Sequence, residues 1–224
     1  MGKQLVRLYP IDIKRMAWEP VEGLADGVRQ KVLALDPQGG SATRYLKVAP
    51  GSEVRGSTLD RWEETYVLEG SFRLGDGRFD AGSYLCRPPG SVLERMESDG
   101  GCLCIQVRDI DERLDKGEVT LRPNDIEAMP WAPTPSGHPG HAEKILSSGP
   151  SGSFTRLLLI DPGADTSVPD DHEHNEEVLI LQGSCRNGEE FHPVGTYTFN
   201  PPHSVHGPFL VDEPLLCFEV KNQP

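Results

Sequence analysis

The sequence predicts an all-β protein made of two tandem copies of one strand-rich domain. Its 224 residues include 24 glycines and 20 prolines, and only 36% are hydrophobic. This composition favours many short strands joined by tight turns over long helices. Apolar runs interrupted by glycine, such as residues 66–74 and 178–184, have the pattern of such strands. Short strands with turn residues about every ten positions are typical of a sandwich or a barrel.

An internal repeat divides the chain into two halves. Trp18 and Trp131 lie 113 residues apart. The same interval joins many other identical pairs: Ile13/Ile126, Met16/Met129, Pro20/Pro133, Lys31/Lys144, Glu63/Glu176, Glu64/Glu177, Gly70/Gly183, Gly82/Gly195, Pro88/Pro201, Pro89/Pro202, Ser91/Ser204, Val92/Val205 and Cys104/Cys217. So many matches at one offset indicate a duplication. We therefore expect two domains, residues 1–115 and 116–224, with the boundary in the charged segment after the last strand of the first half.

Composition and charge exclude several classes of function. A formal net charge of −13 opposes binding to nucleic acid or to an anionic membrane, because phosphate groups would be repelled. No apolar run approaches the length of a membrane span, and the first ten residues lack the apolar core of a signal peptide, so we expect a cytoplasmic location. The five cysteines show no paired Cys-x-x-Cys spacing, which favours buried thiols over a disulfide framework.

One short stretch in the second half carries the strongest chemical signal. Residues 169–177 contain two histidines and several carboxylates directly before an apolar run. If the stretch is extended, period-two spacing places four side chains on one face: Asp170, His172, His174 and Glu176. Imidazole nitrogens and carboxylate oxygens that converge on one face can bind a divalent metal. The alternative is an acidic, solvated loop that happens to contain two histidines.

A second segment offers a further ligand. Residues 195–208 begin with an apolar alternation typical of a strand and continue into Pro201-Pro202 and a His-Gly-Pro sequence. These residues indicate a rigid turn. Such a turn can hold His203 or His206 in a fixed orientation at the mouth of a sheet.

Together, the two segments resemble the motifs of the cupins. The first motif of that family contains His, His and Glu, and a strand with Pro-x-Gly leads to a second motif with His. More specifically, the chain resembles the ChrR-type cupins, whose second motif is similar to residues 200–208. His172, Glu176 and His206 stand at the intervals of that group, four and thirty residues apart.

One position departs from the pattern of the ChrR-type cupins. In this register Asp170 stands where the family has a histidine, and His174 lies outside the usual set. If the motif is instead aligned on the His-x-His pair, His174 stands only two residues before Glu176, which is shorter than the family spacing. Both registers share the three residues named above. Three others compete for a fourth ligand position: Asp170, His174 and His203.

The two halves serve as a control for the metal site. Of the candidate ligands, only Glu176 has an identical counterpart, Glu63. The other counterparts differ: Ser57 for Asp170, Leu59 for His172, Arg61 for His174 and Leu93 for His206. All seven histidines follow residue 137. We therefore expect a metal site in the second half and none in the first, with Arg61 as the counter-charge of Glu63.

Four other polar residues are expected to have ordinary roles. His138 and His141 lie in a polar loop and are expected to be solvated, with a position over the metal pocket as the alternative. His192 aligns with Phe79 and is expected to pack. Glu177 faces away from Glu176 in an extended strand and is expected at the surface.

The resemblance implies a fold and a set of activities. Cupins are small double-stranded β-helix, or jelly-roll, domains, and two in tandem make a bicupin. A site of two imidazoles and a carboxylate accepts one divalent ion, either Zn or Fe, with Ni or Mn as alternatives. In cupins, similar sites serve dioxygenases, isomerases and ligand-sensing domains. Three interpretations follow: a metal-dependent oxygenase acting on a small dicarbonyl, phenolic or carboxylate compound, a ChrR-like sensor module, and a structural zinc protein.

The expected partner is a small-molecule ligand or substrate, and a homodimer remains open. In ChrR the cupin is the zinc-binding sensor part of an anti-sigma factor, and a separate helical domain inhibits the sigma factor. Residues 1–30 contain neither Cys nor His and are too short for that helical domain. A sigma factor is therefore implied as a partner by the resemblance alone.

Overall fold

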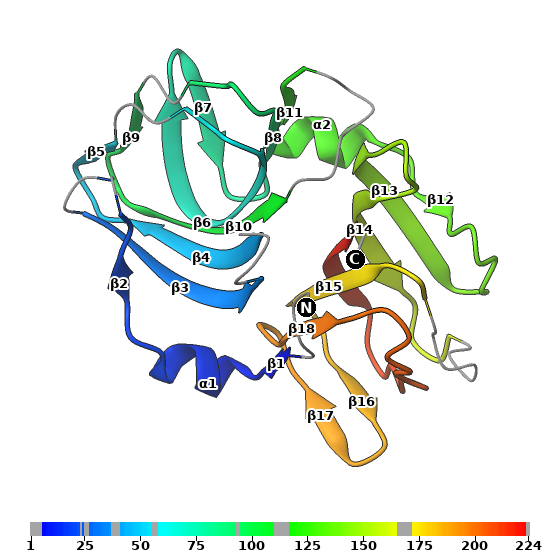
Figure 1. The fold of residues 1–224 in the computed structure, drawn as a ribbon. Coiled ribbons are helices and arrows are strands. Elements are labelled where there is room, and N and C mark those ends of the chain that lie inside the picture. The colour runs from blue at the N-terminus through cyan, green and yellow to red at the C-terminus, as the bar shows by residue number, and fades with distance from the viewer. Residues whose placement is uncertain are drawn as a thin grey trace. The chain divides into compact units, whose positions relative to one another are not determined.

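The computed structural model describes residues 6–22, 24, 27–36, 41–54, 58–92, 95–109, 117–164 and 172–222. Strands dominate these residues, as expected for an all-β protein (Figure 1). The same residues contain two short helices, α1 (Pro10–Arg15) and α2 (Pro123–Ala128). Within these ranges we find no helix with the length and apolar character needed to cross a bilayer.

The strands repeat along the chain. The first strand is β1 (Val6–Leu8), and the first half continues with β2 (Glu19–Pro20), β3 (Val28–Leu35), β4 (Ala42–Val48), β5 (Ser52–Val54), β6 (Trp62–Leu74), β7 (Gly77–Asp80), β8 (Tyr84–Arg87), β9 (Met96–Ser98) and β10 (Cys102–Asp109). The second half contains β11 (Val119–Leu121), β12 (Ala132–Pro133), β13 (His141–Ser148), β14 (Phe154–Ile160), β15 (Asn175–Gln182), β16 (Cys185–Asn187), β17 (Glu190–His192), β18 (Tyr197–Asn200) and β19 (Leu215–Asn222).

Each half is organised around an antiparallel sheet with the same strand order. One sheet runs β11-β8-β6-β10-β4-β3-β2, and the other runs β1-β18-β15-β19-β14-β13-β12. Strands that correspond in the sequence repeat, such as β6 and β15 or β10 and β19, occupy the same place in the two sheets. The sequence repeat is therefore also a repeat of architecture, as predicted.

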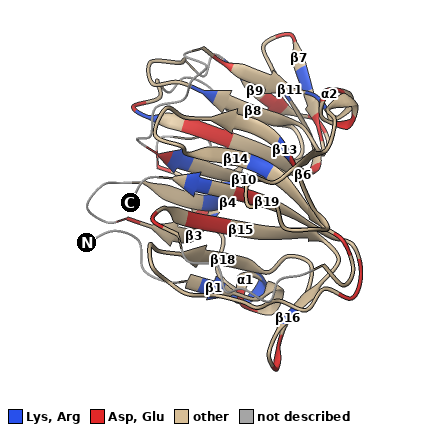
Figure 2. Ribbon diagram, turned by 90° about the vertical axis from the view of Figure 1, so that its right-hand side faces the viewer, with Lys and Arg blue, Asp and Glu red and all other residues tan. Residues whose placement is uncertain are grey.

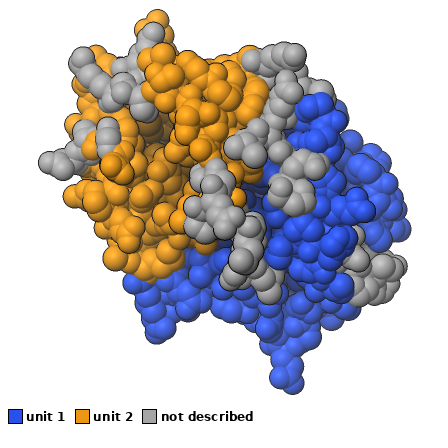
Figure 3. Space-filling view, viewed as in Figure 1, with its two compact units in different colours: residues 1–15, 129–224 blue, residues 16–128 orange. Residues whose placement is uncertain are grey.

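The short strand that precedes each half pairs with a strand of the other half. β1 pairs with β18, and β11, its counterpart in the repeat, pairs with β8. The chain accordingly forms two compact units (Figure 3). In the order of the two halves, we call residues 16–128 (orange in Figure 3) the first unit and residues 1–15 with 129–224 (blue) the second unit. This division differs from the expected one, 1–115 and 116–224, in the placement of two short segments. The repeat shows which residues correspond, but it does not show which sheet edge a segment joins.

Two glycines of the repeat are required by close backbone approach. Gly70 and Gly183 have φ values of 71° and 76°, in the left-handed region. A Cβ at Gly70 would lie 2.1 Å from the carbonyl oxygen of Gly101, and one at Gly183 would lie 2.3 Å from that of Pro214. These contacts explain why both halves have glycine here, within β6 in the first half and directly after β15 in the second.

Each unit has its own apolar core, and the five cysteines are free and buried, as expected. The expectation that Glu177 lies at the surface is wrong. Its side chain is only 3% exposed and accepts a 2.6 Å hydrogen bond from the hydroxyl of Tyr197. Glu64 accepts the same contact from Tyr84 at 2.7 Å. Residues on both faces of these strands are buried, so facing away from Glu176 does not expose a side chain.

Candidate metal centre

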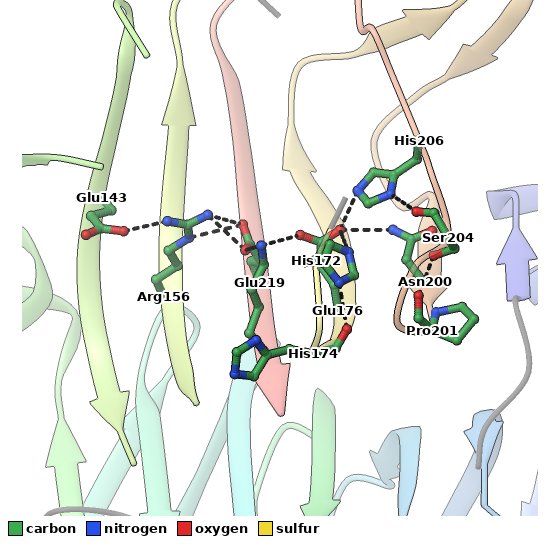
Figure 4. A network of polar contacts seen from close by, with 11 residues as sticks. Glu143, Arg156, His172, His174, Glu176, Asn200, Pro201, Ser204, His206 and Glu219 are labelled. Carbon is green, nitrogen blue, oxygen red and sulfur yellow. Dashed lines mark hydrogen bonds and ion pairs between the residues drawn. The ribbon is translucent and has the colours of Figure 1, made fainter. Parts of the chain in front are cut away.

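Three side chains meet inside the second unit (Figure 4). His172 precedes β15, Glu176 lies on β15, and His206 follows β18. The Nε2 atoms of His206 and His172 lie 2.8 and 3.5 Å from Oε2 of Glu176. One ligand atom from each residue lies within 4.8 Å of the others, and all three residues are buried. The three residues shared by both readings of the motif therefore form one cluster.

Backbone contacts orient the two imidazole rings. Nδ1 of His172 lies 2.6 Å from the carbonyl oxygen of His174, and Nδ1 of His206 lies 2.8 Å from that of Ser204. A carbonyl only accepts hydrogen bonds, so Nδ1 of each neutral ring must donate, and Nε2 carries the lone pair. This is the usual outer contact of a metal-ligating histidine.

The buried Nε2 atom of His172 has no hydrogen-bond partner among the described residues. It faces the carboxylate of Glu176, so two acceptors lie opposite each other. A cation between them would satisfy both groups, whereas leaving them opposed is unfavourable. The donor set and its orphaned nitrogen therefore fit a divalent metal.

Neighbouring strands hold the carboxylate in place. Glu176 pairs in register with Asn200 of β18 and with Lys221 of β19. The side-chain amide of Asn200 donates to Oε2 at 3.0 Å, and the ammonium of Lys221 lies 3.1 Å from Oε1. The two contacts fix the rotation of the carboxylate.

The same surroundings keep Glu176 charged. Burial alone would raise the pKa of its carboxyl group, but the close imidazoles of His172 and His206 and the charge of Lys221 outweigh this effect. The pKa of Glu176 is therefore held well below its ordinary value. Burial also acts to lower the pKa of His172, and its contacts with Glu176 outweigh burial and raise it. At neutral pH the cluster contains a carboxylate anion, the form that binds a metal.

The two histidine-bearing loops are connected by their backbones. The amide of His203 donates to the carbonyl of His172 at 2.9 Å. His203 has a φ of 61°, and its counterpart Gly90 has a φ of 86°. The turn therefore requires the left-handed region at this position in both halves. His203 itself is exposed, and its side chain is not part of the cluster.

His174, one of the three competitors for a fourth ligand position, is not part of the cluster. The side chain of His174 points away from Glu176, and only its backbone carbonyl takes part in the cluster (Figure 4). Strand β15 begins at Asn175, so the period-two alternation that we assumed does not extend over residues 172–174. Asp170, the other competitor, lies outside the described residues.

A buried ion network adjoins the cluster and was not predicted. Arg156 on β14 donates to Glu219 on β19 at 2.8 to 3.1 Å and to Glu143 on β13 at 2.5 Å. Lys221 lies 3.9 Å from Glu219 and 3.1 Å from Glu176, and so connects this network to the cluster. The available signal was the presence of isolated charged residues within apolar strands. Figure 2 likewise shows acidic residues within β15 itself.

A cavity of about 570 Å³ lies beside the cluster. Glu176, His206 and Lys221 line it together with apolar side chains such as those of Leu158 and Phe209. Several other polar residues also line it: Arg7, Arg156, His138, His141 and His192. His192 is buried, as expected, whereas His138 and His141, expected in a solvated loop, border the cavity. A small organic molecule would fit next to the candidate ligands.

In the first unit, Glu63, the counterpart of Glu176, has different partners. Glu63 lies 2.6 Å from Nη2 of Arg87 and 3.7 Å from Nε of Arg108. The expected counter-charge, Arg61, instead pairs with Asp60 at 3.1 Å. Ser57 and Leu93 lie outside the described residues. The described part of the chain contains no second group of metal-type ligands.

The repeated jelly-roll architecture and the single candidate metal centre define a two-domain cupin. A family model described as the ChrR Cupin-like domain matches residues 7–109 and again residues 122–224. The chain belongs to this family. No match to the sequence is found among curated proteins.

Solved structures with the same fold include several enzymes. A candidate dioxygenase from Nostoc punctiforme has a TM-score of 0.81 at 18% identity, over 99% of this chain and 83% of that chain. The Streptomyces albus protein HEPD, with 2-hydroxyethylphosphonate and Fe(II) bound, has a TM-score of 0.68 at 7% identity, over 99% and 76%. A salicylate 1,2-dioxygenase from Pseudaminobacter salicylatoxidans has a TM-score of 0.64 at 13% identity, over 87% and 76%. At these identities the similarity shows the fold alone.

Proposed function

We propose that the second unit binds one divalent metal ion through His172, Glu176 and His206, and that the protein is an oxygenase acting on a small organic molecule. The observation that carries the proposal is two imidazoles and one carboxylate beside a cavity. This donor set, with coordination positions left for substrate, is characteristic of non-haem Fe(II) oxygenases. Iron is therefore the metal we favour over zinc, nickel or manganese. The dioxygenases and the Fe(II)-containing protein with the same fold support this choice.

The ion would supply Lewis-acid and redox chemistry at the edge of the cavity. The protein's own residues would bind and orient the substrate. Lys221 lines the cavity, so its ammonium group can pair with a carboxylate or phenolate of the substrate. Leu158, Val178 and Phe209 offer an apolar wall that excludes water from the bound molecule. These features favour a small phenolic, dicarbonyl or carboxylate compound as the substrate.

A ChrR-like sensor is the second candidate, and the match to the ChrR cupin-like family favours it. In that case binding of metal or ligand would change a contact with a partner protein. A sigma factor as that partner rests on the family name alone. A purely structural zinc site is less well supported, because such sites are closed by four protein ligands. Here the cluster has three described ligands, and two of them, Glu176 and His206, line a cavity.

Metal analysis and oxygen uptake test the proposal. The protein should be purified without chelators or a histidine tag, beside His206→Ala and the control His203→Gly. The control removes an exposed imidazole from the same turn and introduces the residue of the first half. We expect about one equivalent of iron in the wild type and the control, and a large loss in His206→Ala.

Oxygen uptake would then be measured with salicylate and with small dicarbonyl compounds. Uptake that depends on both substrate and iron supports the oxygenase. One equivalent of inert, tightly bound zinc without oxygen uptake would favour the sensor. A protein that binds no metal even after reconstitution would refute the metal site itself.

A further inference from the structure

The first unit also contains a cavity, of about 440 Å³. Its walls include apolar side chains of the core of that unit, among them Leu46, Phe72 and Met96. Three arginines, Arg44, Arg87 and Arg108, line the same space. The loss of metal ligands in this half has therefore not been accompanied by filling of the interior.

The charge of this cavity is unbalanced. Glu63 is the buried carboxylate among its lining residues, and Glu22, the other acidic residue there, is exposed. Arg44 is held by neutral groups, since its guanidinium donates to the amide oxygens of Gln30 and Gln106. Three guanidinium groups thus face one buried carboxylate in a chain whose net charge is −13.

Two of these arginines have unused donors. Arg87 is 5% exposed, and its Nε and Nη1 atoms have no hydrogen-bond partner among the described residues. The Nε atom of Arg108 also lacks a hydrogen bond, although it lies 3.7 Å from Glu63 and Nη2 of the same residue binds Asp60 at 2.6 Å. Unsatisfied N–H groups on a buried cation are costly, and an anionic acceptor relieves that cost most effectively.

Compared with the second unit, the side chains around the first cavity are consistently less negative or more positive. Gln30 and Gln106 stand where that unit has Glu143 and Glu219. Arg87 stands where it has Asn200. Each of these differences makes the first cavity more positive. Arg44 and Arg156 occupy equivalent places, because Arg44 pairs in register with Gln106 of β10 and Arg156 with Glu219 of β19. Around these two arginines the units keep the same network geometry with opposite charge balance.

We propose that the cavity of the first unit binds a small organic acid, with its anionic group at Arg87 and Arg108 and its apolar body against the core side chains. Carboxylate is the natural partner of a guanidinium that has free N–H groups. The apolar walls favour an organic acid over an inorganic anion, because burial of its hydrocarbon part adds to the binding free energy. This site is separate from the candidate metal centre and does not depend on its function.

Calorimetric titration with benzoate tests the site, with benzamide as a neutral molecule of the same shape. We expect benzoate to bind the full-length protein at least tenfold more tightly than benzamide. Inorganic phosphate should bind more weakly than benzoate. Equal binding of benzamide would contradict a charge-based site, and phosphate binding as tight as benzoate would contradict the organic-acid class.

Variants place the binding in the first unit. Arg87→Gln should weaken benzoate binding by about tenfold or more. Arg78→Gln removes the same charge from an exposed side chain and should leave binding unchanged. Glu63→Gln removes the competing carboxylate and should tighten binding, a gain that misfolding cannot produce.

The metal site provides the last control. Benzoate could also bind at the second unit, so the titration is repeated with His206→Ala. Binding that persists in this variant supports the proposal. Binding that disappears with His206→Ala, or that is unaffected by both Arg87→Gln and Glu63→Gln, would overturn it.

Discussion

Replacement of Arg156 by methionine should strongly destabilise the second unit. The guanidinium of Arg156 makes hydrogen bonds to both carboxylate oxygens of Glu219 and one to Glu143, and all three residues are buried. Arg156→Met leaves two carboxylates without their cation. Breaking a buried pair in this way costs about 3–5 kcal/mol. For a unit of this size, such a loss lowers the unfolding temperature by roughly 10 °C or more.

The effect should depend on pH. Burial raises the pKa of Glu219 above its ordinary value of 4.5, and the charge of Arg156 opposes this effect. A carboxyl group with a raised pKa in the folded state destabilises the protein increasingly as the pH rises from its unfolded value through its folded value. Without Arg156 the pKa of Glu219 rises further, so the deficit of Arg156→Met should shrink as the pH is lowered from 7.5 to 5.5.

Differential scanning calorimetry at several pH values measures both effects. The control is the double variant Glu143→Gln with Glu219→Gln, which gives Arg156 the neutral partners that Arg44 has in the first unit. This control should cost much less than Arg156→Met. A deficit below about 1 kcal/mol for Arg156→Met at pH 7.5, or one that does not change with pH, would refute the assignment of a buried ion network.

Three further predictions concern the fold and the candidate site. Gly183→Ala should lower the free energy of unfolding, measured by urea denaturation, by about 2 kcal/mol more than Gly188→Ala. Both glycines have a positive φ, but only a Cβ at Gly183 would meet a backbone oxygen. Equal losses in the two variants would contradict this close approach. His172→Ala should lose the bound metal and His174→Ala should retain it in elemental analysis, and loss in both would restore His174 as a ligand. Tyr197→Phe should lower the free energy of unfolding by about 1–3 kcal/mol, since it removes a donor from a buried carboxylate; an unchanged value would contradict that contact.

Much of the fold could be predicted because duplication is visible in the sequence itself. The interval of 113 residues aligned strands that occupy equivalent places in the two sheets. The pairing of β1 with β18 could not be predicted in the same way. Two copies of a segment fit two equivalent sheet edges equally well by sequence, and only the three-dimensional path of the chain determines which edge each segment joins.

At the site, the resemblance to the cupin motifs indicated which residues come together, but not the orientation of each side chain. His172, Glu176 and His206 were chosen because they stand at the intervals of the ChrR-type cupins, and the structure brings them into one cluster. His174 was misplaced because the chain is not yet extended where it lies. The burial of Glu177 was missed because alternation distinguishes the two faces of a strand, but does not show whether the second face is exposed.

The partner of Glu63 was assigned wrongly because a comparison of sequences does not show which residues pair across strands. Arg61 was chosen because it is near in sequence, whereas Arg87 lies directly opposite Glu63 across β6 and β8. The same register places Asn200 opposite Glu176 in the second unit. An arginine at this cross-strand position puts a permanent cation on Glu63. In the second unit the neutral Asn200 stands there, and Glu176 instead adjoins Lys221 and two histidines. The cross-strand residue is thus one of the differences, together with the histidines that the first half lacks, that distinguish the two buried carboxylates.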